Sequence, residues 1–397
     1  MSGEIIFLAH RIPYPPDRGD RIRGFHILHH IARLRPVHLL GFVDSKEDED
    51  AAKALLPMLA SLHVEVRAKS TLRAGLEALL LREPVSVAAF RSRRIKRTTS
   101  RLLAGRTIDT IFVYSGQMTQ FVPEHRGGRR FIIDFVDVDS EKFAAYGAAD
   151  RGMKGWVHRR EARLLARYEN GAARRADANL FVSEAEASLF RQRTGLTLDH
   201  VRALDNGVDT VAFDPACYPR ADDTGPMIVF TGQMDYRPNV DAVEWFARRT
   251  FPAIRAKHPS ARFAIVGRNP NPAVRQLAAL KNIIVTGEVP DVRPWIAAAA
   301  AVVAPLDIAR GVQNKMLEAM AMARPLVATP AAIEGIDAVP GEHLLVASGY
   351  DMANAVSYLL ANPDEGDAIG RAARTHMVAR YGWEAQLQAL DGMIGID

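Results

Sequence analysis

The chain has 397 residues, of which 48% are hydrophobic and 24% are charged. This composition excludes disordered and fibrous classes, and the length favours two domains. The single cysteine, Cys217, excludes an internal disulfide and argues against a cysteine-based metal cluster. The longest apolar runs are too short to span a bilayer, and the chain starts directly with a strand-like segment, so we expect a cytoplasmic protein.

Strands alternate with helices in the first half of the chain. Strands are expected at residues 4–9, 37–43, 63–67, 110–114, 130–134 and 178–182, and helices at 22–34, 49–61, 72–81, 86–103 and 156–176. Such alternation implies a parallel sheet with helices on both faces.

The pattern restarts after the polar stretch 218–226, which is the best linker. Strands are expected at residues 227–231, 262–266, 283–286, 301–304, 325–329 and 344–347, and the first three are followed by Gly232, Gly267 and Gly287. Asn239 is expected to cap a helix that runs to about residue 257. We therefore predict an α/β protein with two Rossmann-like domains at 1–205 and 206–380. A C-terminal helix at 381–397 is expected to pack back on the first domain.

The segment 311–329 carries the strongest functional signal. It reads as a loop containing Gly311, a short helix with Asn314, Lys315 and Glu318 near its start, and a buried strand. A helix N-terminus attracts phosphate, a preceding glycine lets the phosphate approach, and a lysine strengthens the attraction. A carboxylate one turn further along can accept hydrogen bonds from a ribose diol. The segment thus indicates a site for a nucleotide that carries a diphosphate. In open α/β sheets such ligands bind beyond the carboxyl ends of the strands, so we expect the site in a cleft between the domains.

Cations gather in two segments, residues 91–106 and 151–175, although the net charge is only +5. No nucleic-acid module or basic-aromatic stacking platform is recognisable, so nucleic acid is not an expected partner. An anionic membrane surface is a better candidate, because Trp156 lies among cations. Solvated helix faces are an equally good explanation.

Several motifs resemble the retaining glycosyltransferases of family 4. They are Asn206-Gly-Val-Asp209, Val229-Phe-Thr-Gly232 followed by Pro238-Asn239, and Leu317-Glu318-Ala-Met-Ala321. Residues 13–20 and 137–142 are most similar to the exosortase-associated sugar transferases of that family. The resemblance implies a GT-B fold and a hexosyltransferase-type enzyme for bacterial exopolysaccharide biosynthesis. It would move a sugar, with retention, from a nucleotide-diphosphate sugar in the C-terminal domain to a glycan or lipid-linked acceptor in the N-terminal domain. No metal or other cofactor is implied.

The family's residue pattern is matched in part. Glu318 matches the acid that binds the donor ribose, but Arg310 stands where the family has its first acid. Gln233 occupies the usual arginine place, and Arg237 lies beside the usual lysine place. We hypothesise that Arg310, Lys315 and Arg237 together neutralise the leaving diphosphate. The alternative is that Lys315 pairs with Glu318 and Arg310 is solvated.

In the N-terminal half, Gly19 resembles the family's flexible glycine loop, flanked by Arg18, Arg21 and Arg23. Asp137 is expected either to bind a substrate hydroxyl or to cap the next helix. The predicted catalytic residues are Arg237, Lys315, Arg310 and Asp137, and the predicted donor-binding residues are Gly19, Gly232, Gln233, Gly267, Gly311, Asn314 and Glu318. No metal ligands are expected, since the cluster of His26, His29 and His30 lacks a carboxylate in register.

Two other functions fit the same architecture. A nucleotide-sugar epimerase of GT-B fold would need acid and base residues but no acceptor. A non-catalytic sugar-nucleotide-binding regulator would account for Arg310 in place of an acid. For each of these functions the expected location is the cytoplasm. If the Arg-rich helices bind lipid, the protein is expected at the inner face of the cytoplasmic membrane.

Overall fold

The computed structural model describes residues 3–16, 19–67, 69–218, 225–307 and 312–396. The chain forms two compact units, Met1–Asp205 with Leu387–Asp397, and Asn206–Gln386. Residues 381–386 of the expected C-terminal helix belong to the second unit and the remainder to the first. Most of the predicted linker, residues 219–224, lies outside the described residues.

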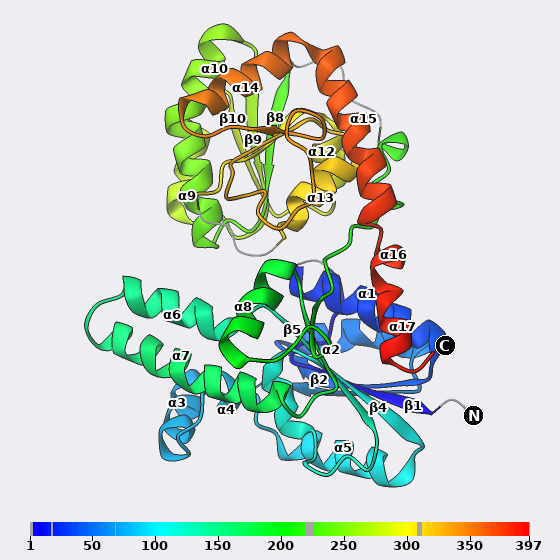
Figure 1. Ribbon diagram of the computed structural model, residues 1–397. Helices are drawn as coiled ribbons and strands as arrows, with labels where there is room; N and C mark the ends of the chain where they lie inside the picture. Colours follow the sequence, from blue (N-terminus) through cyan, green and yellow to red (C-terminus); the bar gives the residue numbers. More distant parts are fainter. Residues whose placement is uncertain (1–2, 17–18, 68, 219–224, 308–311, 397) are drawn as a thin grey trace. The chain divides into compact units, whose positions relative to one another are not determined.

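The first unit is built on a parallel sheet with the strand order β3-β2-β1-β4-β5-β6-β7 (Figure 1). Its strands are β1 (Glu4–Ala9), β2 (Val37–Val43), β3 (Ser61–Val66), β4 (Ile108–Tyr114), β5 (Arg130–Val136), β6 (Ala178–Phe181) and β7 (Val201–Ala203). The central strands are apolar on both faces, and β1 and β2 are buried almost throughout. This burial on both faces is what a parallel sheet covered by helices requires. The six strands expected from the sequence are all present, and β7 was not predicted.

Helices cover the sheet of the first unit, and two short helical turns accompany them. They are α1 (Gly19–Leu34), α2 (Lys46–Ala52), η1 (Lys53–Met58), α3 (Thr71–Leu80), α4 (Val85–Ala88), α5 (Arg93–Gly105), η2 (Gly116–Phe121), α6 (Asp139–Ala149), α7 (Gly152–Ala173), α8 (Glu184–Thr194) and α17 (Ala389–Met393). The prediction of one helix at 86–103 is wrong, because the chain breaks between α4 and α5. The Ser92 hydroxyl accepts the Ile95 N–H and so starts a new helix.

Helices α6 and α7 pair side by side (Figure 1). The Ser140 hydroxyl of α6 donates to the Glu169 carboxyl of α7 at 2.5 Å, and both residues are buried. Burial raises the pKa of Glu169 to about 8, which keeps the carboxyl neutral at neutral pH. The pair is therefore joined without a buried charge.

The C-terminal segment is anchored by contacts with α1 and with Arg35, the residue that follows α1. His30 Nε2 lies 2.7 Å from the Asp391 carboxyl, and the Arg35 guanidinium donates to the Ile394 carbonyl at 3.1 Å. His30 thus has a carboxylate partner, supplied from the end of the chain and not from its own helix. Among the residues that the structure describes, no three histidine, cysteine or acidic side chains are grouped to hold a metal ion.

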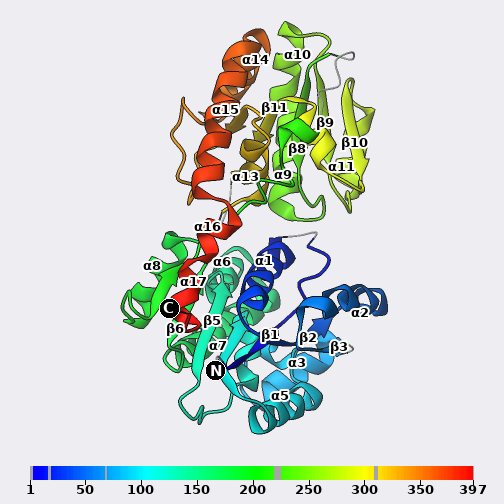
Figure 2. The ribbon, with the colours of Figure 1, turned by 90° about the vertical axis from the view of Figure 1, so that its right-hand side faces the viewer.

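The second unit has a parallel sheet with the order β10-β9-β8-β11-β12-β13 (Figure 2). Its strands are β8 (Met227–Thr231), β9 (Arg262–Val266), β10 (Ile283–Gly287), β11 (Ala299–Ala304), β12 (Leu326–Ala328) and β13 (Leu345–Val346). The helical segments are η3 (Pro215–Cys217), α9 (Arg237–Trp245), η4 (Phe246–Thr250), α10 (Phe251–Lys257), α11 (Pro272–Gln276), η5 (Leu277–Ala279), α12 (Arg293–Ala297), α13 (Asn314–Ala321), α14 (Tyr350–Ala361), α15 (Pro363–Arg380) and α16 (Trp383–Leu387). Both units are therefore Rossmann-like, as the alternating pattern predicted. No described helix is long and apolar enough to cross a membrane.

Candidate functional site

Two glycines end adjacent strands at the carboxyl edge of the second sheet. Gly232 follows β8 and Gly267 follows β9, with φ angles of +156° and +153°. The Gly232 N–H donates to the Val266 carbonyl at 3.0 Å, and the Gly267 N–H donates to the Gly287 carbonyl at 3.2 Å. A Cβ on Gly267 would overlap the Gly232 carbonyl oxygen. Only glycine fits there, and the two loops meet backbone to backbone.

Lys315, on the first turn of α13, reaches this edge. Its Nζ donates to the Asn239 side-chain oxygen at 2.6 Å and lies 4.5 Å from the centre of the Phe230 ring. A Cβ placed on Gly232 would be 3.3 Å from the same nitrogen. The amine is thus held beside the glycine loop by one hydrogen bond and one aromatic face.

Asn239 joins the helix α9 to this arrangement. The expectation that it caps the helix is wrong, because α9 begins at Arg237 with Tyr236 as its N-cap residue. Asn239 lies inside the first turn, is 6% exposed, and donates from its amide to the Gln233 carbonyl at 2.9 Å. Its two ends therefore bridge the loop after β8 and Lys315.

Burial changes the pKa values of Lys315 and Glu318 more than the charge of either residue changes the pKa of the other. Burial lowers the pKa of Lys315 to about 7, and the nearby Glu318 carboxylate opposes that change only in part. Burial likewise raises the pKa of Glu318 to about 7 against the influence of Lys315. Both side chains keep part of their surface accessible, so a ligand can reach them. An anion that binds at Lys315 would favour its charged form.

Glu318 lies one helical turn beyond Lys315. In the described part of the chain, its carboxylate makes no side-chain hydrogen bond and no ion pair within 4 Å. The alternative was that Lys315 is merely the ion-pair partner of Glu318. The two described side chains make no direct contact that would support it. The carboxylate oxygens remain available to a ligand's hydroxyl groups.

A cation that sequence reasoning missed is Arg268. It follows Gly267 directly, and its guanidinium lies against the Gln233 side chain, whose amide oxygen accepts from Arg268 Nε at 3.1 Å. A basic residue next to a strand-ending glycine was the available signal. Gln233 stands where the family that the motifs resemble usually has an arginine. Arg268 supplies a guanidinium beside that position.

The other predicted donor residues are distributed unevenly. Asn314 begins α13 and accepts at 3.2 Å from the Asn206 amide. The Arg237 side chain is 90% exposed and lies 3.5 Å from the Asp241 carboxylate on its own helix. Arg310 and Gly311 lie outside the described residues. The structure thus gathers Gly232, Gln233, Gly267, Asn314, Lys315 and Glu318 at one end of the second unit, while Arg237 extends from the helix surface.

The carboxyl edge of the first sheet is filled by side chains. Arg23 from α1 forms an ion pair with Asp134 at 2.9 Å and donates to the Leu204 carbonyl at 2.7 Å. Both charged groups are almost fully buried. Val136, two residues after Asp134, has a φ of +71°, which is strained for a β-branched residue. The strand β5 therefore ends in a fixed and strained turn.

Asp137 follows this turn. Loss of hydration, and then repulsion from the Glu186 and Asp139 carboxylates, raise the pKa of Asp137, although the residue as a whole is exposed. The capping alternative is wrong, because Val138 is the N-cap residue of α6 and no side chain caps it. Asp137 remains a predicted contact for a substrate hydroxyl.

Gly19 is the first residue of α1. Arg21 lies 2.9 Å from the Asp48 carboxylate, and Arg23 is paired as described above. Both of these arginines are buried and serve the packing of α1, while Arg18 lies outside the described residues.

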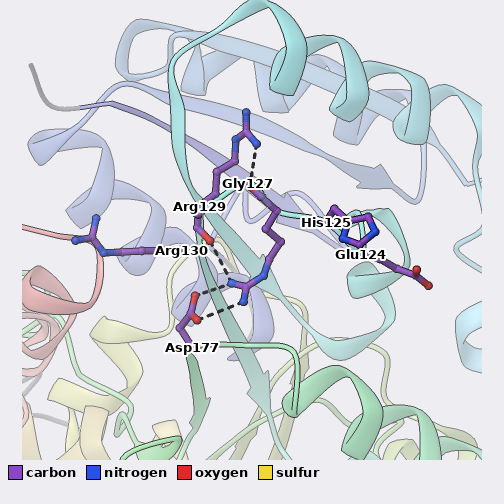
Figure 3. Close-up of a pocket in the computed structure, with 8 residues that line it drawn as sticks. Glu124, His125, Gly127, Arg129, Arg130 and Asp177 are labelled. Carbon is purple, nitrogen blue, oxygen red and sulfur yellow. Dashed lines mark hydrogen bonds and ion pairs between the residues drawn. The ribbon is translucent and has the colours of Figure 1, made fainter.

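A cavity of about 640 Å³ lies elsewhere, between residues 124–130 and Asp177 (Figure 3). Arg126 forms an ion pair with Asp177 at 2.6 Å, and Arg129 donates to the carbonyls of Leu103 and Ile108 at 3.0 Å. These guanidinium groups brace the loop before β5. None of the predicted site residues lines this cavity, which borders the amino end of the strand.

Comparison with known proteins identifies similar folds. Residues 225–362 match the family model described as glycosyl transferases group 1. HepE from Anabaena, solved in complex with UDP, superposes with a TM-score of 0.69 at 12% identity over 98% of this chain and 99% of that chain. Sucrose-phosphate synthase from Thermosynechococcus elongatus gives a TM-score of 0.66 at 16% identity over 98% of both chains. WaaG, a glycosyltransferase involved in lipopolysaccharide biosynthesis, gives 0.66 at 15% identity over 98% and 100%. No curated protein sequence matches the chain.

The family match covers the part of the second unit that contains Gly232, Lys315 and Glu318. The whole chain has the two-domain Rossmann-like fold of GT-B glycosyltransferases, and its second unit matches the group 1 glycosyltransferases.

Proposed function

We propose that this protein is a retaining glycosyltransferase that uses a nucleotide-diphosphate sugar. The observation that carries the proposal is the meeting of Gly232, Gly267, Lys315 and Glu318 at the carboxyl edge of the second sheet. Glycine backbone and an amine suit a diphosphate, and a carboxylate one turn away suits a ribose diol. The family match over residues 225–362 supports the same assignment, and the UDP that HepE binds makes UDP the nucleotide that we propose for this site.

The chemistry follows from these groups. The diphosphate gains negative charge as the sugar leaves it, so Lys315, together with the α13 N-terminus and Arg268, would stabilise that charge. An acceptor hydroxyl would attack the anomeric carbon on the face that the diphosphate leaves. The new glycosidic bond would form as the bond between sugar and phosphate breaks, the departing phosphate would take the hydroxyl proton, and the anomeric configuration would be preserved. Asp137 in the first unit would contact a hydroxyl of acceptor or donor.

We further propose a glycan or lipid-linked acceptor in bacterial exopolysaccharide biosynthesis, at the cytoplasmic face of the membrane. The motif resemblance of residues 13–20 and 137–142 supports this role. The cationic helices α5 and α7 support an anionic membrane surface as a partner.

A panel of nucleotide sugars tests the proposal. A true donor should raise the thermal midpoint of the wild-type protein, because a ligand that binds only the folded state stabilises it. With that donor and an acceptor pool, NMR of the product's anomeric signal should show the donor's configuration. An inverted product would exclude retention, and an epimer formed without acceptor would favour the epimerase. Binding without hydrolysis or transfer would favour the regulator.

A further inference from the structure

Helix α3 turns a row of leucines to solvent. Leu72, Leu76, Leu79 and Leu80 follow the spacing of one helical stripe and are 83%, 65%, 54% and 83% exposed. The opposite side of the helix buries Ala74 and Ala78. The core of the first unit therefore takes the small residues of α3 and leaves its large apolar residues outside.

Helix α7 carries a second row of exposed apolar side chains. Met153, Trp156 and Val157 are 83%, 53% and 42% exposed. They share one face of the helix with Arg160, since residues three, four and seven apart are neighbours on a helix. The Arg160 guanidinium donates to the Ala78 carbonyl at the end of α3 at 2.8 Å. The end of α3 is therefore held against α7, and the two helices lie near each other in Figure 1.

The charge that surrounds these rows is positive. Arg163 and Arg167 are exposed and continue the same face of α7, and neither has an ion pair within the described residues. The nearby acids are engaged: Glu77 pairs with Lys69 at 2.8 Å, Glu83 pairs with Arg91, and Asp150 pairs with Lys154 at 3.4 Å. Two further acids of α7, Glu161 and Glu169, are buried.

We propose that this surface docks on an anionic lipid bilayer. We name it the α3–α7 face and define it by Leu72, Leu76, Leu79, Leu80, Met153, Trp156, Val157, Arg163 and Arg167. Leucine and tryptophan side chains enter the interfacial layer, while arginines meet lipid phosphates. A second copy of the chain fits less well, because its own arginines would face these arginines.

The α3–α7 face differs from the cationic helix α5. Exposed cations line α5, including Arg97 and Arg101, but no large apolar side chain of α5 is exposed. Attraction to a membrane by charge alone is weak and is screened by salt. Binding through inserted apolar side chains persists at high salt. The inference rests on and deepens the membrane partner of the proposed function, but it does not depend on the transfer reaction, since no predicted site residue lies on this face.

Vesicle sedimentation tests the apolar part. Wild-type protein should bind vesicles of equal parts phosphatidylglycerol and phosphatidylcholine, and bind pure phosphatidylcholine more weakly. L72S/L80S should lower the partition coefficient roughly tenfold or more, since removing partial insertion of two leucines exceeds 1.4 kcal/mol. The matched control is L198S, because Leu198 is 63% exposed in the same unit and lies outside the face. Wild-type binding by L72S/L80S would overturn the proposal.

Charge substitutions test the arginines. R163Q/R167Q should weaken binding to the anionic vesicles at least tenfold, from about 1 kcal/mol for each cation near the surface. R97Q/R101Q on α5 removes equal charge and should change binding several-fold less. An equal loss in both variants would overturn the assignment to the α3–α7 face and leave general attraction by charge.

Tryptophan quenching reports contact directly. Anionic vesicles that carry brominated lipid should quench the wild-type emission, and Trp156→Phe should remove most of that quenching. All substituted side chains are exposed, so the thermal midpoints should match the wild type. Absent quenching would overturn membrane insertion. A change from dimer to monomer in L72S/L80S, seen in sedimentation velocity without vesicles, would assign the face to a second copy instead.

Discussion

The carboxyl edges of the two sheets have opposite designs. In the second unit, strands end in Gly232 and Gly267, and the backbone approaches so closely that a side chain on Gly267 would not fit. In the first unit, the equivalent edge is occupied by the buried Arg23–Asp134 ion pair and by Val136 in a strained conformation. Two copies of one architecture thus offer different surfaces.

The difference indicates a division of labour. An open glycine backbone with Lys315 beside it suits a diphosphate, whose charge is spread over several oxygens. A filled edge that presents Asp137 suits neutral hydroxyl groups, because its carboxylate would repel an anion. Each prediction below tests one side of this contrast.

Gly267→Ala should have the largest effect. The new Cβ would overlap the Gly232 carbonyl, and alanine rarely adopts a φ of +153°. We expect a loss of about 3 kcal/mol in the unfolding free energy, from strain and a backbone shift, together with loss of nucleotide binding. Chemical denaturation measures the first and calorimetric titration with UDP the second. The control is Gly341→Ala, which also has a positive φ, +85°, but open space around its Cβ. Equal losses in the two variants would show that φ alone matters, not the close approach.

Lys315→Ala should weaken UDP binding about 100-fold, since a hydrogen bond to a charged group contributes about 1.5–3 kcal/mol. Lys281→Ala, at an exposed position outside the edge, is the control and should bind as the wild type does. UDP affinity is the appropriate measurement because it does not depend on the acceptor. Unchanged UDP affinity in Lys315→Ala would contradict the proposal that the diphosphate binds at this edge.

Asn239→Ala should weaken UDP binding about tenfold, because Nζ of Lys315 loses the partner that holds it at 2.6 Å. The effect should be smaller than that of Lys315→Ala, since the amine itself remains. Asn239→Asp replaces the amide by a charge that raises the pKa of Lys315, so the affinity should persist to higher pH than in the wild type. A role limited to stability would leave the pH profile of Asn239→Asp unchanged.

The pH dependence of UDP binding provides a test of the amine's charge. Burial lowers the pKa of Lys315 to about 7, below its ordinary value of 10.5, so the amine is mostly neutral above pH 7 in the free protein. A bound diphosphate favours the ammonium form, and binding above pH 7 should take up a proton. The affinity should then fall as pH rises, by up to about tenfold per pH unit.

Calorimetry at pH 8 in two buffers of different ionisation enthalpy measures that proton uptake. Lys315→Ala should abolish it. Glu318, whose pKa is about 7, is mostly ionised at this pH and contributes little. Equal proton uptake in the wild type and Lys315→Ala would assign the titration to another group.

The sequence patterns predicted the strands better than they predicted the contacts between side chains. The bounds of β1, β2, β8 and β9 agree with the expected ranges to the residue, because short apolar runs that are rich in β-branched and aromatic residues and are bounded by glycine or polar residues are typical of buried parallel strands. The helix expected at 86–103 failed, since the hydroxyl of Ser92 competes locally for a backbone N–H.

The candidate site shows the same limit. Lys315 and Glu318 were predicted from their place on a short helix after a glycine, and α13 carries both. Asn239 was read as a local cap, but its amide reaches Lys315, which lies 76 positions later. Arg268 was missed because its relation to Gln233 exists only where two loops meet. Local patterns predict elements, whereas such partners depend on how strands are ordered in the sheet.

Asp137→Asn should give the smallest effect and sharpens the contrast from the side of the first unit. The substitution removes a carboxylate that repels Glu186 and Asp139, so folding stability should stay equal or rise slightly. UDP affinity should not change, because the proposed diphosphate site is at the carboxyl edge of the other sheet. The KM for the acceptor should rise about threefold to tenfold, because asparagine keeps an oxygen that accepts a hydrogen bond and loses only the charge that strengthens it. Asp199→Asn, at an exposed position of the same unit, is the control. A rise in KM with constant kcat indicates that Asp137 binds the acceptor, whereas a weakened UDP affinity would contradict the division of labour between the two edges.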